Sequence, residues 1–393
     1  MSYFISYIEL TLFIYRIFHK FMYKNLIVCI VFPFLFMGCG ERSVKFPETR
    51  NEEPDIQLNT LNLIPVQCSP VDASYVGTLH WVNDYLYYID EKFCALFVFD
   101  SEGNFVDRHL THGSGPNELA TKNIVGYCHL NGNRHFFIGP SNDCYIFNSH
   151  FQKDNFYVIA RGWTQKDKSY DSPYYYTLSY PKLIMRSYGD NIYTNVYCEH
   201  PNLHMFISYS EYISQAHFLA TINSKNGLME NVFGNYTPPY KKDNTKQFTL
   251  VNYDIDQYGN FYISLEADSL IYKYDNSFHP LTAFGYKGKA MTNNYMTLNS
   301  IKDFRRESLI QRETRSHYTW LEYIDERELL FRSYQKDETC STDGLQIYER
   351  AKLIGDLDVP KGFRVIGYSE PNFIASVPID EDGEIIVFYK FKL

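Results

Sequence analysis

The sequence predicts an all-β fold built from repeated antiparallel sheets, and its composition gives the first reason. Of the 393 residues, 18% are aromatic, with 36 Tyr and 30 Phe, and 45% are hydrophobic against 21% charged. Aromatic side chains fit the pleated, half-buried surface of a sheet, and this balance excludes an intrinsically disordered chain. The net charge of −9 argues against general nucleic-acid binding, because such binding depends on neutralising phosphates.

A repeated pair of apolar segments is the second reason and identifies the fold more closely. In each copy an apolar segment is followed by a polar gap and then by a second apolar segment, which usually ends in an aromatic residue and an acid or amide. The copies are 86–90 with 96–100, 136–138 with 144–148, 192–194 with 205–207, 261–264 with 270–275, 329–332 with 345–349, and 373–375 with 385–388. Six copies at irregular spacing are typical of a six-bladed β-propeller with variable loops. We therefore expect six blades, each an antiparallel four-stranded sheet.

A turn motif of the form D-x-x-G-[NE]-apolar supports the hairpins. It occurs at Asp100–Phe105, Asp256–Phe261 and Asp380–Ile385. The acid can cap the turn through the backbone, and Gly can take the positive φ angle that closes a hairpin. The third copy also resembles part of a calcium loop, but an EF-type loop needs further ligands and a closing Glu at set distances. We therefore interpret it as a turn.

The last blade needs a strand from the start of the domain, because a closed ring leaves no exposed sheet edge. We expect that strand near residues 56–66. A short helical insertion is predicted near 299–315, where apolar residues recur at helical spacing and Ser300 can cap the first turn. It is either a solvated helix packed between blades or a lid whose arginines reach an anionic ligand. Those arginines are Arg305, Arg306, Arg312 and Arg315.

The N-terminal region has the features of an export signal. Residues 26–37 form an uncharged apolar run of 12, shorter than the roughly 20 residues of a membrane-spanning helix and typical of a signal peptide. A small residue stands directly before Cys39, which resembles a bacterial lipobox and makes Cys39 the predicted lipidation site. The alternative is a generic signal peptide or N-terminal anchor with an incidental cysteine.

Three regions follow from these patterns. Residues 1–39 are the predicted lipoprotein signal region, and a compact n-region after Met22 makes Met22 the hypothetical true start. Residues 40–55 are polar with two prolines and are expected to be a flexible tether. Residues 56–393 are expected to form a single propeller. The predicted location is the bacterial cell envelope, with the lipid anchor in the outer membrane.

The cysteines do not indicate a metal or redox centre. No pair has the C-x-x-C spacing of a zinc ribbon or a thioredoxin-like site. Cys94, Cys128, Cys144 and Cys198 lie in apolar, strand-like sequence, where buried free thiols are the common outcome. Neither a metal site nor a cofactor is predicted.

One loop carries a family resemblance. Residues 112–118 read His-Gly-Ser-Gly-Pro-Asn-Glu, which resembles the G-x-G-P-x-E signature of the uncharacterised six-bladed, TolB-like β-propeller lipoproteins of Bacteroidota. The similarity extends over roughly residues 60–393. It implies the propeller fold and the lipid anchor. It carries no catalytic residue, because the motif marks a blade.

The search for reaction motifs gives no catalytic residue. Sialidase-type Asp boxes, a nucleophile elbow, an H-E-x-x-H zinc motif and a P-loop are all missing from the sequence. An aromatic stretch from 161 to 181 is the candidate recognition loop, with Trp163, Tyr170 and Tyr174 as tentative ligand-binding residues. Alternatively, 174–176 begins a blade strand and buries alternate rings.

Three functions remain open. The favoured one is an envelope-anchored lipoprotein whose propeller binds a protein, peptide or glycan partner and no nucleic acid. The alternative is a propeller hydrolase or lyase that acts on a carbohydrate or lactone with carboxylates in its channel. A third is a structural component of an envelope complex. Whether the protein is an enzyme stays open, because groups from separate blades can meet without any local motif.

Overall fold

The structure is a computed structural model that describes residues 45–47, 49–50, 53–161 and 169–393. The predicted signal region with Cys39, and Trp163 of the aromatic stretch, lie outside the described residues. Among those that are described, no helix is long and apolar enough to cross a membrane.

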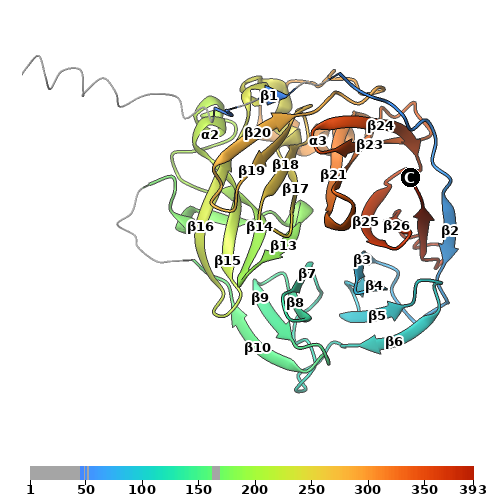
Figure 1. The fold of residues 1–393 in the computed structure, drawn as a ribbon. Coiled ribbons are helices and arrows are strands. Elements are labelled where there is room, and N and C mark those ends of the chain that lie inside the picture. The colour runs from blue at the N-terminus through green and yellow to red at the C-terminus, as the bar shows by residue number, and fades with distance from the viewer. Residues whose placement is uncertain (1–44, 48, 51–52, 162–168) are drawn as a thin grey trace, which may run out of the picture. The chain divides into compact units, whose positions relative to one another are not determined.

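Six antiparallel sheets with four core strands each form a β-propeller, as predicted (Figure 1). The first two blades are β3 (Gly77–Val82), β4 (Tyr85–Asp90), β5 (Ala95–Phe99) and β6 (Phe105–His109), then β7 (Gly126–Leu130), β8 (Arg134–Ile138), β9 (Asp143–Phe147) and β10 (Lys153–Val158). The third blade is β13 (Met185–Tyr188), β14 (Asn191–Cys198), β15 (His217–Asn223) and β16 (Leu228–Asn235).

The remaining blades repeat the order. The fourth is β17 (Val251–Ile255), β18 (Phe261–Leu265), β19 (Ile271–Tyr274) and β20 (Pro280–Phe284). The fifth is β21 (His317–Ile324), β22 (Leu329–Gln335), β23 (Asp343–Glu349) and β24 (Lys352–Val359). The sixth is β25 (Arg364–Ser369), β26 (Asn372–Ser376), β27 (Val387–Phe391) and β2 (Ile64–Gln67).

The chain closes its ring with β2. This strand pairs antiparallel with β27, and Figure 1 shows it in blue beside the red C-terminal strands. The predicted closing strand is therefore confirmed, at Ile64–Gln67 near the end of the expected range. Two short strands, β1 (Thr49–Arg50) and β11 (Ala160–Arg161), add in parallel to β20 and β16. They cover outer sheet edges that would otherwise leave backbone groups unpaired.

The repeated apolar pairs are the second and third strands of the blades. These strands are covered by neighbouring blades on both faces, so β5 and β18 are buried along their whole length. Five of the six predicted pairs are confirmed by strand pairing. The pairing of 192–194 with 205–207 is wrong, because β14 pairs with β15 (His217–Asn223). The segment between them forms turns and helix α2 (Tyr209–Gln215), whose apolar residues are buried in the core.

Two turns of the predicted form share one geometry. Asp100 Oδ1 accepts from the Asn104 backbone N at 2.9 Å, and Asp256 Oδ1 accepts from the Asn260 backbone N at 2.8 Å. The glycine before each Asn has a φ of 81° or 82°. In the third copy the positive φ falls on Glu384, at 53°, one residue later than expected.

The motif at 112–118 is a loop built around one carboxylate. Glu118 Oε2 accepts from the Gly115 backbone N at 2.7 Å. A Cβ atom on Gly113 would lie 2.0 Å from the same oxygen. The Glu118 carboxylate thus packs directly against both glycines, which gives the motif a structural role in this loop.

The two ends of the ring carry different loops. Hairpins on one end are short; β3 and β4, for example, are joined by Asn83–Asp84, both at positive φ as in a type I′ turn. The other end, the insertion face, holds the connections between blades and the turns between second and third strands. It carries α2, the 3₁₀ helices η3 (Pro238–Lys241) and η4 (Asp243–Phe248), and α3 (Ile301–Thr314). Helix α3 confirms the predicted insertion.

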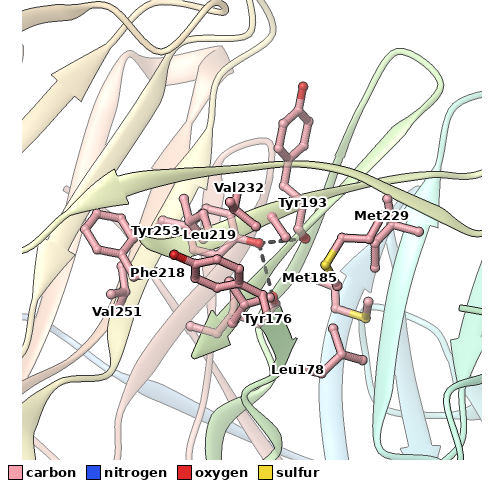
Figure 2. Packing of buried hydrophobic residues seen from close by; sticks show 14 of the residues in the cluster. Tyr176, Leu178, Met185, Tyr193, Phe218, Leu219, Met229, Val232, Val251 and Tyr253 are labelled. Atoms are coloured by element: carbon pink, nitrogen blue, oxygen red, sulfur yellow. Dashed lines mark hydrogen bonds between the residues drawn. The ribbon is translucent and has the colours of Figure 1, made fainter. Parts of the chain in front are cut away.

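The blades are joined by a continuous core of aromatic and aliphatic side chains. Figure 2 shows part of it between the third and fourth blades, with Tyr176, Phe218 and Tyr253 among the residues drawn. The Tyr253 hydroxyl donates to the Tyr193 carbonyl at 2.7 Å and to the Ile184 carbonyl at 3.1 Å. This contact ties the innermost strand of the fourth blade to the third blade.

Candidate functional site

The innermost strands of the blades surround a central channel, and a cavity of about 730 Å³ opens at its insertion-face end. The first residues of these strands line it, together with the loop before β13. A smaller cavity of about 270 Å³ occupies the opposite end. Both cavities are bounded by His80, Arg186 and Trp320, so these side chains mark the level at which the two ends of the channel meet.

Polar side chains reach the channel because an innermost strand has no further strand on its inner edge. Thr78 in β3 and Arg364 at the start of β25 are exposed although they lie at the centre of the ring. Their neighbours Leu79 and Val365 are buried between blades. The period-2 alternation of a strand thus separates core residues from channel residues.

Two basic side chains of the insertion-face cavity have no carboxylate partner among the residues that the structure describes. Lys182 Nζ donates to the Thr319 carbonyl at 2.6 Å and to Asn252 Oδ1. Arg364 lies 5.4 Å from the centre of the Trp320 ring and makes no ion pair or hydrogen bond through its side chain with any described residue. Both cations therefore contact neighbouring residues of β21, Thr319 and Trp320.

The electrostatic surroundings of Lys182 are dominated by burial. Burial lowers the pKa of Lys182 to about 7, Glu266 opposes this shift, and Arg364 and Arg312 add to it. Lys182 and Arg364 both line this cavity. With a pKa of about 7, Lys182 is about half protonated near neutral pH, so the negative charge of a bound anion would favour its protonated form.

A second pair of charges at the same end is already neutralised. Arg312 of α3 donates two hydrogen bonds, of 2.7 and 2.6 Å, to the Glu266 carboxylate. Burial alone would raise the pKa of Glu266, but Arg312 outweighs burial and holds the pKa below its usual value. Burial also lowers the pKa of the nearby His317 to about 4, so this imidazole is neutral at pH 7.

Helix α3 was expected to be either a solvated helix packed between blades or a lid whose arginines reach a ligand, and its contacts have features of both. Arg312 lines the cavity, whereas Arg306 pairs with Asp303 and Glu307 on the helix surface. Arg315 lies 3.6 Å from Asp337. The helix thus packs on the insertion face and presents one of its four candidate arginines to the cavity.

Carboxylates at the opposite end of the channel are held by one arginine. Arg186 donates to Asp254 at 2.6 Å and to Glu322 at 2.7 Å. Burial, together with the charge of Asp254, raises the pKa of Glu322 to about 8 although Arg186 acts against the shift. The Tyr323 backbone N also donates to Asp254 at 2.7 Å. Asp254 therefore supplies the negative charge beside the Arg186 guanidinium, and Glu322, mostly protonated at neutral pH, accepts a hydrogen bond from it.

Unpaired acids in the insertion-face cavity lie on its outer turns. Glu91 and Glu381 line the cavity, each on a turn between the second and third strands of its blade, and neither forms an ion pair with a described residue. No cluster of three or more His, Cys, Asp or Glu among the described residues is arranged to hold a metal ion.

The residues proposed from the aromatic stretch lie away from the channel cavity. Tyr170 donates to Glu211 at 3.2 Å, and its ring meets His200 edge-on at 4.7 Å. Tyr174 belongs to a 3₁₀ helix, η1 (Pro173–Tyr175), and meets the Tyr175 ring edge-on at 5.0 Å. The strand alternative begins later than expected, at Tyr176 in β12 (Tyr176–Leu178).

The four cysteines predicted as buried free thiols are confirmed. Burial raises the pKa of Cys94 to about 11 and the pKa of Cys128 to about 12. A thiol with such a pKa is almost entirely protonated at neutral pH and is a poor nucleophile. These cysteines act as core residues.

Together, the closed ring and its cation-lined mouth define a six-bladed β-propeller with a polar central cavity. Among solved structures, the chain is similar to a DUF4221 family member from Bacteroides vulgatus, with a TM-score of 0.64, 14% sequence identity and coverage of 85% of this chain and 98% of that one. It also resembles a protein from Bacteroides fragilis named as exported, with a TM-score of 0.47, 16% identity and coverage of 86% and 98%. At 14% identity, the similarity to the Bacteroides vulgatus protein shows a common fold and says nothing about function. No family model and no curated protein sequence matches the chain.

Proposed function

We propose that the protein is a binding propeller of the bacterial cell envelope that takes its ligand into the insertion-face end of the channel. One observation carries the proposal: a polar cavity of about 730 Å³ opens there, on the face that also carries α2, α3, η3 and η4. Its volume lies within the range of about 300–1,000 Å³ common for small-molecule sites. Binding residues gather on loops held by a rigid scaffold, and this face has the longest ones.

The partner classes follow from the site. A channel mouth of this size admits a short glycan or one end of a peptide, in keeping with the protein, peptide or glycan partner predicted from the sequence. Catalysis by channel carboxylates has less support, because Asp254, Glu322 and Glu266 are each engaged by an arginine. Binding is the function that needs nothing beyond the groups present.

A plug in the channel tests the proposal. Thr78 is exposed in the cavity, with its Oγ1 3.1 Å from His80 Nε2, so Thr78→Trp should fill the mouth without entering the core. Thr78→Val is the matched control, because it removes the hydroxyl and keeps the shape. The purified chain is screened by thermal shift against neutral and acidic oligosaccharides and short peptides.

We expect at least one compound to stabilise the wild type and Thr78→Val but not Thr78→Trp. At a hundred times its Kd, a ligand adds about 2.7 kcal/mol to the free energy of unfolding, which raises the melting temperature by several degrees. Compounds that stabilise all three proteins equally would place binding outside the channel. A screen in which no compound stabilises the wild type would also count against the proposal.

The envelope location rests on the predicted signal region and has its own test. Cys39→Ala should abolish lipidation and move the protein from the membrane fraction into the soluble fraction. Cell fractionation and the mass of the mature N-terminus measure this. Unchanged membrane partitioning, with no lipid mass on the wild-type N-terminus, would refute the anchor at Cys39 and leave the channel proposal untouched.

A further inference from the structure

We infer that the ligand carries a carboxylate, which binds to Lys182 and Arg364 in the channel mouth, on a hydroxyl-rich body such as a short acidic oligosaccharide. This inference rests on the proposed function and adds the chemical class of the ligand.

The geometry of the two cations supports the inference first. Arg364 comes from the start of β25 and Lys182 from the loop before β13, and both line the same cavity. Lys182 contacts the Thr319 carbonyl, and Arg364 packs on the Trp320 ring. Because Thr319 and Trp320 are consecutive, both positive groups contact one short piece of β21 and line one cavity.

The second support for a carboxylate ligand is that two of the cations lining the cavity are not paired with a carboxylate of the described residues. Among the cations that line the cavity, Arg186 is matched by Asp254 and Glu322, and Arg312 by Glu266. Lys182 and Arg364 have no ion-pair partner among the described residues, and Arg364 keeps all its donors free of protein acceptors there. A guanidinium fork without a partner is suited to the planar carboxylate group, which it binds with two parallel hydrogen bonds.

The remaining walls of the cavity favour a singly charged, hydroxylated ligand. Glu91 and Glu381 line its outer part and would repel a second negative charge, so a carboxylate is favoured over a phosphoryl group. Thr78, Thr319 and Gln335 also line the cavity; the threonines offer hydroxyl groups, and Gln335, whose amide nitrogen donates to backbone carbonyls, offers its amide oxygen. Tyr180 adds an aromatic ring that is partly exposed. Hydroxyl, amide and aromatic groups together are the usual partners of a sugar ring.

The charged groups around Lys182 predict how binding depends on pH. Facing it are Glu266 from the turn after β18, Arg312 from α3, His317 from β21 and Arg364 from β25. Both arginines stay charged, Glu266 stays ionised, and His317 is neutral above about pH 4. Since the pKa of Lys182 is about 7, its positive charge is present below pH 7 and disappears above it. Affinity for a carboxylate should therefore fall as pH rises above 7, by at most about tenfold per pH unit.

The test compares acids with their neutral esters. Galacturonic acid, glucuronic acid and sialyllactose, which carry one carboxylate each, are titrated calorimetrically, together with their methyl esters, into the wild type, Arg364→Gln, Lys182→Gln and Lys182→Arg. Arg305→Gln is the matched control, because Arg305 is exposed on α3 outside the cavity and the change in charge is the same. Arg364 makes no ion pair or side-chain hydrogen bond with the described residues, so Arg364→Gln gives up only the contact with the Trp320 ring and should fold and melt nearly like the wild type.

The expected result is that at least one acid binds and that its ester binds at least about tenfold more weakly, because hydrogen bonds to a charged group are lost. Arg364→Gln and Lys182→Gln should each lower the affinity for the acid by about ten- to a hundredfold, and Arg305→Gln should leave that affinity unchanged. Lys182→Arg should retain binding but lose the pH dependence.

The outcomes separate the two proposals. The carboxylate inference would be overturned if acid and ester bind equally, if no acid binds, or if Arg364→Gln leaves the affinity for the acid unchanged. If a neutral sugar or a peptide still binds and Thr78→Trp abolishes its binding, the channel proposal survives alone. If an acid binds but neither Thr78→Trp nor Arg364→Gln weakens it, the ligand lies outside the channel and both proposals fail.

Discussion

Arg332→Met should lower the free energy of unfolding by at least about 3 kcal/mol, because it removes the donor at the centre of a buried network. Arg332 is fully buried in β22. Its guanidinium donates to the Tyr286 carbonyl at 2.7 Å and to the Ser269 carbonyl at 2.9 Å, both in the fourth blade. It also donates twice to Gln346 and lies 3.9 Å from the Tyr318 ring centre. The side chain thus joins the fourth and fifth blades. Methionine would remove the donor of the Ser269 carbonyl and take donors from the Tyr286 carbonyl and from Gln346, which keep bonds from other side chains.

Equilibrium unfolding in urea measures the effect, with Arg305→Met as the control for losing an exposed arginine. Arg332→Lys should fall between the wild type and Arg332→Met, because lysine keeps the charge but lacks the planar fork. A loss of less than about 1 kcal/mol in Arg332→Met would show that the network contributes little beyond packing.

Arg312→Met should produce a comparable loss and also reverse a pH dependence. Glu266 is fully buried, so removal of its partner leaves a buried carboxylate, at a cost of about 3–5 kcal/mol. In the wild type the pKa of Glu266 is lowered, so the stability it contributes is present at neutral pH and is lost as pH falls through that pKa. Without Arg312, burial raises the pKa, and the variant should become more stable as pH falls from 7 toward 5.

The double variant Arg312→Met/Glu266→Gln completes the cycle. Because it removes both charges, it should regain much of the lost stability and lose the reversed pH dependence. Urea unfolding of the wild type, both single variants and the double variant at two pH values gives the coupling energy. Additive losses in the cycle would contradict the tight pairing of Arg312 with Glu266.

The sequence-based fold prediction succeeded where the signal is local. Strands buried on both faces leave continuous apolar runs, so the second and third strands of a blade are readable within a dozen residues. The error at 205–207 has the same origin. Met205 and Phe206 are apolar because they pack near α2 and α3, as the Phe206–Phe304 ring contact at 5.3 Å shows, and a short apolar run alone does not separate that role from a strand.

The candidate site could not be found in this way. Lys182 ends a short 3₁₀ helix, η2 (Tyr180–Lys182), and Arg364 opens a strand after Phe363, so neither lies in a motif that marks a ligand site. They line one cavity because ring closure brings the third and sixth blades to one axis. The partnerless state of Arg364 depends on where every carboxylate of the channel lies, which requires the packed structure. By contrast, Tyr170 and Tyr174 were conspicuous in the sequence through local aromatic density alone.

A crystal structure of the protein with the tightest ligand from the screen tests the central claim most directly. The account predicts ligand density in the insertion-face end of the channel, with an anionic group within hydrogen-bond distance of Lys182 Nζ and the Arg364 guanidinium. Density on the outer side of the third blade beside Tyr170 and Tyr174, with the channel mouth empty of ligand, would contradict it.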